Sequence, residues 1–465
     1  AHRKRYKGDY NPDIKSYNEK TKKYTQHTTY RGKDFAATID KNGNVYFQSD
    51  EYKGEYNLYK LENGTKKRLT NFSTSIMWPK VSANGEKIVF RKDYQLYVYD
   101  VAKKSSKKLK IDINNNSTTQ QEQSFDVKGN VTFFDVSEDG KKMAFVSRGK
   151  LFVSDVAGKF VKEIETNPKE AVKEVKWLKD NSSLLFSRSV NGYYNWFVTS
   201  ANNAFKTRQL TKSTENNRQL TLNEDRTKGV YLSGRNGLYI IDLNTYKTEA
   251  IVKDEFWAFY NSNPYFSPDG KHILYSARRD FEEDIFVYNI ATKKAINLTK
   301  TKVSESDPHW SPDGKYIYFS SERTAPSFPS GGNGASKVYQ MALDKYEKPF
   351  SIDKVNDLFV EKSKDKKDKK EEIEPITINE KGLMDRLTTI SPRFGGQRDV
   401  SIIKEGVKTH VLYLSNHDQG RNKLWKTTIE PFENNKTVKL SDSPSFGYQL
   451  VSAGKKHYVL SRGTI

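Results

Sequence analysis

A short turn-forming tetrapeptide recurs along this chain, each time just before an apolar, strand-like run. The clear copies are Asp40-Lys41-Asn42-Gly43, Ser82-Ala83-Asn84-Gly85, Ser137-Glu138-Asp139-Gly140, Ser267-Pro268-Asp269-Gly270 and Ser311-Pro312-Asp313-Gly314. Two degenerate copies lie between the third and the fourth: Leu178-Lys179-Asp180-Asn181 and Asn223-Glu224-Asp225-Arg226. Most steps between successive copies are 41 to 45 residues. A repeat of this length in a strand-rich chain is typical of β-propeller blades.

One repeat shows what each unit contains. The residues suited to strands in it are 263–266, 272–276, 284–288 and 295–299, with a polar loop expected over Arg278–Glu283. Pro presets the first position of the turn, Asp can bond its own backbone, and Gly accepts a positive φ. Four strands joined by three turns make one antiparallel blade. In several repeats the first strand carries a large aromatic residue before the turn, and we expect these side chains to pack between blades: Trp78, Trp177, Phe266 and Trp310.

The repeat also predicts where the domains divide. The one long step contains the polar stretch 112–119, so we expect a boundary there, with residues 1–117 holding the last blades of a first propeller. Residues 118–465 then hold seven repeats of a second propeller, the last of them incomplete. A Lys/Asp/Glu-rich insert at 351–374 offers little to bury, and we expect it to be solvated. The first residues read as late strands of a blade and the chain stops after a second strand, so we expect a piece of a longer protein.

Composition narrows the classes of function. The net charge is +21, but the Lys residues are spread through loops and turns beside acidic or amide residues, which indicates a solvated surface and not nucleic-acid binding. Part of this charge could attract acidic peptides. There is no cysteine, which excludes disulfides and Cys-based sites. No apolar run approaches the roughly 18 residues that a membrane span needs.

The search for chemistry finds no catalytic set. The chain has no Gly-x-Ser-x-Gly elbow, no His-Glu-x-x-His and no phosphate-binding Gly loop. His272 and His309 lie in adjacent repeats and could face one channel, although we expect packing or solvent exposure for both. The Asp-containing turns lack the spacing and the distal Glu of a Ca²⁺ loop. We therefore expect no catalytic, cofactor-binding or metal-binding residue in this chain, and propellers that serve a partner domain.

The repeat resembles the TolB and tricorn type of propeller, in which Ser-Pro-Asp-Gly precedes a strand and Leu-Thr closes a blade. Two stretches are more specific. Residues 4–14, with Lys4-Arg5-Tyr6-Lys7-Gly8 and Pro12-Asp13-Ile14, resemble the fourth blade of the first propeller in tricorn-like serine peptidases. Residues 375–386, with Pro375-Ile376-Thr377-Ile378 and Gly382-Leu383-Met384-Asp385-Arg386, are similar to a segment late in the second propeller of those proteins.

This resemblance implies an all-β fold with part of a six-bladed propeller followed by most of a seven-bladed one. In such proteins a PDZ-like domain and a C-terminal-processing type of serine peptidase (a hydrolase) follow, so the catalytic residues would lie beyond residue 465. The implied function is to gate and guide peptides or unfolded segments to that domain, and a basic channel lining would favour acidic peptides. A homo-oligomer and a periplasmic or secreted location are expected, with the cytoplasm as the alternative.

Two other functions fit the same residues. A non-enzymatic TolB-like propeller would bind a protein or a glycan in the cell envelope. A prolyl-oligopeptidase-like cap would be followed by an α/β-hydrolase domain. The sequence that follows residue 465 in the gene would separate the three.

Overall fold

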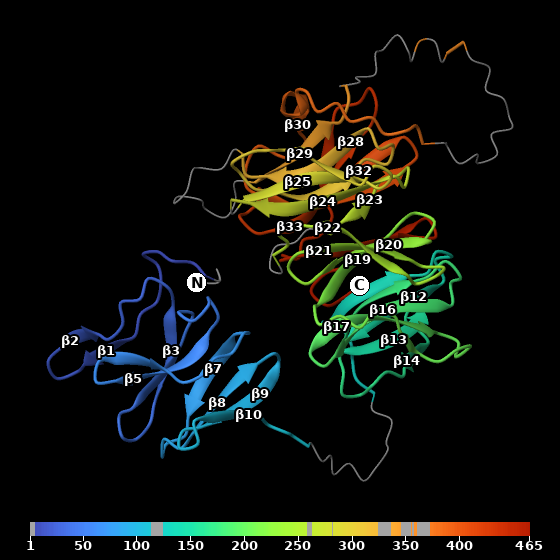
Figure 1. Cartoon of the computed structure of the whole chain (residues 1–465). Coiled ribbons are helices and arrows are strands. Elements are labelled where there is room, and N and C mark those ends of the chain that lie inside the picture. Colours follow the sequence, from blue (N-terminus) through green and yellow to red (C-terminus); the bar gives the residue numbers. More distant parts are fainter. Residues whose placement is uncertain are drawn as a thin grey trace. The chain divides into compact units, whose positions relative to one another are not determined.

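The computed structural model describes residues 5–112, 124–257, 263–280, 282–323, 336–345, 355, 358–359 and 373–465. The chain divides into two compact units, Ala1–Gln123 and Ser124–Ile465. The predicted boundary between residues 117 and 118, and most of the predicted insert at 351–374, lie outside the described residues. Both units are built from antiparallel strands (Figure 1).

The first unit contains three described sheets. A two-stranded sheet pairs β1 (Lys15–Asn18) with β2 (Lys23–Gln26). The next sheet has the order β3 (Asp34–Ile39), β4 (Val45–Ser49), β5 (Asn57–Glu62) and β6 (Thr65–Arg68). The third has the order β7 (Ile76–Val81), β8 (Lys87–Lys92), β9 (Gln95–Asp100) and β10 (Ser105–Lys108).

The described part of the second unit contains six four-stranded sheets and a final two-stranded one, numbered here one to seven in chain order. Sheets one and two are β11 (Val131–Val136), β12 (Lys142–Ser147), β13 (Lys150–Asp155), β14 (Val161–Ile164); and β15 (Val172–Trp177), β16 (Ser183–Val190), β17 (Tyr193–Ser200), β18 (Arg208–Gln209). Sheets three and four are β19 (Asn217–Leu222), β20 (Lys228–Ser233), β21 (Gly237–Asp242), β22 (Thr248–Lys253); and β23 (Tyr265–Phe266), β24 (His272–Arg279), β25 (Glu282–Asn289), β26 (Lys294–Asn297).

Sheets five to seven complete the second unit. Sheet five is β27 (Glu305–Trp310), β28 (Tyr316–Ser321), β29 (Lys337–Ala342) and β30 (Leu387–Thr389), with the 3-10 turn η1 (Leu383–Arg386) just before β30. Sheet six is β31 (Gln397–Glu405), β32 (Lys408–Ser415), β33 (Lys423–Ile429) and β34 (Lys436–Lys439). Sheet seven pairs β35 (Gln449–Ala453) with β36 (Lys456–Leu460).

The seven sheets of the second unit close into a ring. Each sheet packs on the next through a shared apolar cluster or strand contacts, and sheet seven returns to sheet one, where Val451 and Leu460 pack with Phe134 and Phe145. The amide of Gln449 bonds the backbone of Phe134 twice, accepting from its N–H at 3.3 Å and donating to its carbonyl at 2.7 Å. This closed ring of antiparallel sheets confirms the predicted all-β propeller fold.

The repeated turns work as their residue types predict. In the copy at 267–270, the Ser267 Oγ accepts the N–H of His272 at 2.9 Å, and the Asp269 carboxylate accepts the N–H of Lys271 at 3.1 Å. The copies at 137 and 311 repeat both bonds. The turn therefore satisfies its own backbone donors and fixes where the second strand of each sheet begins.

The Leu-Thr signature has an equally local cause. Thr299 donates its hydroxyl to the carboxylate of Asp284 at 3.1 Å and accepts the N–H of Ile285 at 3.1 Å. Thr70 bridges Asn57 and Leu58 in the same way, and Thr211 bridges Asn195 and Trp196. The threonine therefore fastens the end of a sheet to the start of its third strand, where the ladder of backbone bonds ends.

Two local predictions were wrong. Trp177, Phe266 and Trp310 are buried as expected, but Trp78 is 54% exposed, because it occupies a bulge of β7 with φ +56° and not the position before the turn. The polar stretch Arg278–Glu283 is largely strand, since β24 and β25 continue to the pair Arg279↔Glu282. Cross-strand partners such as Arg278 and Glu283, whose charged atoms lie 3.0 Å apart, allow a polar sequence to remain in the ladder.

We predict that the contact between the turns of sheets one and seven stabilises the ring measurably. Gly140 and Gly270 share a turn type and nearly the same φ (+67° and +68°), but a Cβ at Gly140 would lie 2.9 Å from the Gly454 Cα, whereas a Cβ at Gly270 would meet nothing within 4 Å. Gly270→Ala should cost about 1 kcal/mol for the left-handed backbone alone, and Gly140→Ala should cost roughly 2 kcal/mol more. Calorimetric melting of both variants measures this. Equal losses of stability would refute the contribution of the ring closure.

Candidate functional site

The inner strands of the second unit surround a central channel of about 860 Å³. All seven sheets contribute to its described lining, through β11, β15, β19, β23, β27, β31 and β35. Asn263 and Phe446, which precede inner strands, line one end, here called the loop end. Glu224, in the turn after β19, and Ser452, near the end of β35, line the other, here called the turn end. The cavity therefore extends along the whole length of the inner strands.

Bulges interrupt most of these inner strands. The pairing of the first strand with the second shifts register in sheets one, two, three, five and six. Gln219, Asp307 and Asp399 adopt positive φ values of 53° to 56° at the bulges of sheets three, five and six. A bulge leaves one residue outside the ladder of backbone bonds, so its N–H needs another acceptor.

Side chains of the preceding sheet supply those acceptors. The carboxylate of Glu174, in sheet two, accepts the N–H groups of Gln219 and Leu220 at 3.0 and 3.2 Å. Asp307, in sheet five, accepts the N–H of Asp399 in sheet six at 3.1 Å. Burial raises the pKa of Glu174, and the two N–H bonds only partly oppose this. We call this arrangement the inner-strand staple.

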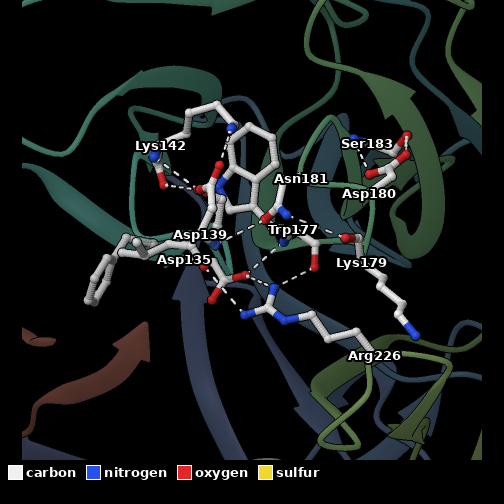
Figure 2. Close-up of polar contacts among 12 residues, drawn as sticks. Asp135, Asp139, Lys142, Trp177, Lys179, Asp180, Asn181, Ser183 and Arg226 are labelled. Carbon is white, nitrogen blue, oxygen red and sulfur yellow. Dashed lines mark hydrogen bonds and ion pairs between the residues drawn. The ribbon is translucent and has the colours of Figure 1, made fainter. Parts of the chain in front are cut away.

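An arginine at a degenerate turn joins three sheets at the turn end. Arg226 replaces the glycine of the repeated turn and has φ +53°. Its Nη1 donates to the carbonyl of Trp177 at 2.7 Å and lies 3.5 Å from the carboxylate of Asp135, while Nη2 donates to the carbonyl of Val136 at 3.4 Å. Figure 2 shows the guanidinium directed at these groups. Asp135 also accepts the N–H of Trp177 at 2.7 Å, so both charged groups of the pair are hydrogen-bonded.

The other degenerate turn, at residues 178–181, also contacts an earlier sheet through the residue that replaces glycine. Asn181 takes the place of the glycine with φ +52°, and its side-chain oxygen accepts the N–H of Asp139, in the turn of sheet one, at 3.3 Å (Figure 2). In both degenerate copies, the residue that replaces glycine therefore contacts an earlier sheet.

Of the two histidines considered from the sequence, the structure places only His309 in the channel lining. Its Nδ1 lies 3.1 Å from the carbonyl oxygen of Asp307, which can only accept, so Nδ1 carries the proton and Nε2 is left as an acceptor. Burial lowers the pKa of His309 to about 4, against the opposing effect of that carbonyl, and the ring is neutral at pH 7. The ring of Tyr265 lies 4.4 Å away. His272 is buried instead in sheet four, where Nε2 lies 3.0 Å from Asn289 Nδ2.

Acidic residues outnumber basic ones in the described lining of the channel, although burial raises the pKa of Glu174 and of Asp399. Five carboxylates line the channel, against three cations: Asp135, Glu174, Glu224, Asp307 and Asp399 against Lys176, Arg226 and Arg462. The chain as a whole carries +21. The basic lining on which a preference for acidic peptides depended is therefore not present in the described residues.

Sequence reasoning did not single out the staple carboxylates, although a signal for them exists. Glu174 and Asp307 each lie three residues before the aromatic that ends the inner strand, Trp177 and Trp310. An acidic residue at that fixed distance in two repeats is unexpected on an inner strand unless it has a structural role. Over the described part of the chain, no group of three or more His, Asp or Glu side chains could hold a metal ion, and no helix there is long and apolar enough to cross a membrane.

A second groove, of about 470 Å³, lies on sheet six. Leu412, Leu414 and Leu424 on that face pack against sheet seven. His410 and Lys426 lie two residues along the same strands from Leu412 and Leu424, on the same face of the sheet, and line the groove beyond that packing. His410 is buried, with Nε2 2.8 Å from Glu405 and Nδ1 2.9 Å from Thr428. The groove therefore lies where the two strands of sheet seven cover less of the sheet-six face.

One buried carboxyl group at the start of an inner strand, that of Glu305, accepts hydroxyl groups and takes no part in the inner-strand staples. Glu305 is fully buried and accepts the hydroxyls of Thr301 at 2.7 Å and Ser321 at 3.3 Å. Burial, aided by the negative charge of Asp284, raises the pKa of Glu305 to about 7, although the two hydroxyls and Arg323 favour the ionised form.

Comparison with known proteins finds matches to two family models, to a relative and to a solved structure. A family model described as TolB beta propeller domain matches residues 230–348, and one described as Dipeptidyl peptidase IV (DPP IV) N-terminal region matches residues 36–112. A tricorn protease homolog of Saccharolobus solfataricus is 31% identical over 154 residues, which are 30% of this chain and 14% of that protein. The crystal structure of the tricorn protease matches 99% of this chain with a TM-score of 0.51 and 17% identity.

These matches confirm the resemblance to the propeller region of tricorn-like proteins. The chain covers 45% of the tricorn protease structure and a smaller share of the homolog, so it spans less than half the length of either. At 17% identity, the structural match establishes the fold alone.

We predict that Arg226→Gly destabilises the second unit, although it restores the glycine of the repeat. The change relieves a left-handed backbone, worth about 1 kcal/mol, but leaves the Asp135 carboxylate buried with its cation removed, which costs roughly 3 kcal/mol. The net loss expected is therefore about 2 kcal/mol, measured by chemical denaturation. Asn181→Gly is the matched control and should be nearly neutral, because the two long neutral hydrogen bonds that are lost, at 3.3 and 3.5 Å, are offset by relief of the left-handed backbone. A gain in stability for Arg226→Gly would refute the bridging role.

We predict that Glu305 makes the protein less stable as the pH rises. The raised pKa means that the folded state keeps a proton up to about pH 7, whereas the unfolded chain loses it near the ordinary value of 4.5. Across that window, stability should fall by about 1.4 kcal/mol per pH unit from this group, with no contribution below it. Denaturation of the parent chain and Glu305→Gln at about pH 5 and about pH 7 tests this. The variant should gain in relative stability at the higher pH, and exposed Glu163→Gln should not. Parallel curves for the parent chain and Glu305→Gln would contradict the assignment.

Proposed function

We propose that this chain, which is similar to the propeller region of tricorn-like proteins, guides extended peptides to a peptidase domain that lies outside it. The observation that carries the proposal is the channel itself, which all seven sheets of the second unit line along its length. The names of the tricorn protease and its homolog supply the reaction class, peptide-bond hydrolysis. In this proposal the described residues of the channel hold and guide the peptide, and the peptidase domain performs the hydrolysis.

The width and chemistry of the channel favour a particular form of substrate. A passage walled by inner strands admits an unfolded chain and excludes a folded domain. Polar side chains and backbone groups at the bulges offer partners for an extended peptide backbone. Because acidic residues outnumber basic ones in the described lining and His309 is neutral, the lining favours neutral or basic segments over acidic ones. The substrate class proposed is therefore unfolded, neutral to basic polypeptide.

The match of residues 230–348 to the TolB propeller model supports a second candidate function, that of a binding module. In that case the chain would be a non-enzymatic binding module for a protein or a glycan, in the cell envelope. The two functions differ in where the ligand binds, because a guided peptide must pass the turn end of the channel. A periplasmic or secreted location is part of either proposal.

We predict that obstructing the turn end will reduce peptide passage. The chain has no cysteine, so one introduced thiol can be labelled selectively. Glu224 lines the turn end and Glu165 lies after the outer strand β14, and both are exposed. With a bulky polyethylene-glycol maleimide on Glu224→Cys, hydrolysis of a long unfolded peptide, by the protein carrying its peptidase domain, should fall roughly tenfold, the change that about 1.4 kcal/mol produces.

The same label on Glu165→Cys is the matched control and should leave hydrolysis unchanged. Unlabelled Glu224→Cys shows whether the carboxylate itself matters. Equal hydrolysis by the labelled pair would overturn the guiding role. Peptide or glycan binding without any peptidase activity in the longer protein would favour the binding module.

A further inference from the structure

A second, longer repeat lies at the loop end of the channel. Residues 391–397 read Ser-Pro-Arg-Phe-Gly-Gly-Gln and residues 443–449 read Ser-Pro-Ser-Phe-Gly-Tyr-Gln. Each copy leads directly into an inner strand, β31 or β35. Each therefore places a phenylalanine, Phe394 or Phe446, three residues before the first residue of that strand.

The glutamine that ends each copy is used differently. Gln397 holds its own loop, since its Nε2 donates to the carbonyl of Phe394 at 2.8 Å and its Oε1 accepts the Ser391 hydroxyl at 2.9 Å. Gln449 instead bonds the backbone of Phe134 in sheet one and takes part in ring closure. The two loops consequently differ in conformation, with a left-handed Gly395 in the first.

This difference decides where each phenylalanine lies. Phe446 is among the residues that line the channel, together with Tyr448 and Leu450, and is 91% exposed. Phe394 is 80% exposed but does not line the channel. Single exposed apolar side chains are common on protein surfaces, so exposure alone does not distinguish either ring. What distinguishes Phe446 is its place in the lining of the channel, where its ring can contact a ligand that enters.

The exposure of Phe446 does not come from an unsupported loop. The neighbouring Ser445 donates its N–H to the carbonyl of Asn422 at 2.8 Å and its hydroxyl to the carbonyl of Gly447 at 2.6 Å. Arg398 donates to the carbonyl of Phe446 at 3.4 Å, and Tyr448 donates its hydroxyl to the carbonyl of Asp399 at 2.8 Å. The backbone on both sides of Phe446 is therefore fixed, which lowers the entropy cost of using its ring as a contact.

We propose that Phe446 binds an aromatic or large aliphatic side chain of an extended peptide at the loop end of the channel. The ligand class is a polypeptide segment with one such residue, because the ring offers an apolar face and Arg462 of the same lining can donate hydrogen bonds to a backbone carbonyl. The proposal deepens the guiding function and rests on it. Phe446 determines which segments are held, and the staples deeper in the channel remain structural.

Binding of two short labelled peptides tests the proposal. They share a neutral Gly/Ser sequence and differ at one central residue, Phe or Ala, and binding is followed by fluorescence anisotropy with this chain. Phe446→Ala should weaken binding of the Phe peptide by roughly tenfold, as for the loss of a central interface contact, and leave the Ala peptide unchanged. Phe394→Ala is the matched control, with the same residue type, loop motif and exposure but no place in the lining, and should change neither.

A second measurement separates a loss of binding in Phe446→Ala from a loss of folded structure in that variant. An environment-sensitive dye on Phe446→Cys should shift its emission when the Phe peptide is added, and the same dye on Phe394→Cys should not. Tight binding of both peptides with no dependence on Phe446 would overturn this proposal and leave the guiding function intact. If the parent chain bound neither peptide, the role of Phe446 would be refuted, whereas the guiding function is refuted only by equal hydrolysis when Glu224→Cys and Glu165→Cys are labelled. Equal weakening by Phe446→Ala and Phe394→Ala would refute a specific role for Phe446.

Discussion

The ring of the second unit depends on backbone N–H groups that bulges free from the inner-strand ladders and that the preceding sheet accepts. A buried N–H without an acceptor costs about 1–3 kcal/mol, so each bulge requires a partner at a defined distance. Glu174 meets this requirement for sheet three and Asp307 for sheet six. The angle between neighbouring sheets is thereby set by hydrogen bonds near the axis, while apolar clusters farther out fill the space between them.

The same interaction determines the electrostatic character of the channel. Glu174, Asp307 and Asp135 lie near the axis because the inner strands need acceptors there, and acidic residues consequently outnumber basic ones in the described lining of a strongly basic chain. Under the proposed guiding function, the surface lysines would attract acidic molecules over a distance that salt shortens, whereas passage along the axis would depend on short-range contacts that salt screens less.

Sequence reasoning reached the parts of this structure that have local causes. The Ser-x-Asp-Gly turns and the Leu-Thr closures are satisfied by atoms within one sheet, so their residue types alone predict them. The inner-strand staples join residues 45 apart, as Glu174 and Gln219 are, or 92 apart, as Asp307 and Asp399 are, and a single sequence gives no direct sign of such pairing. Trp78 was misplaced for the same reason, because its bulge is fixed by Gln48 of the preceding sheet, whose side chain accepts its N–H at 2.8 Å. The acidic residues of the lining and His309 come from different sheets, so their meeting in one channel could be recognised only from the closed ring of the structure.

The two-stranded seventh sheet has a consequence for how this chain behaves on its own. Among the described strands, β36 pairs only with β35, so its other side presents backbone donors and acceptors along Lys456–Leu460. An open edge of this kind is a template on which any extended strand can be added, including one from another copy. The exposed Lys456 lies at the beginning of that edge, and a lysine on an edge strand discourages pairing with another strand. Association through this edge would therefore depend on the backbone of five residues and on one lysine, not on the charge spread over the rest of the surface.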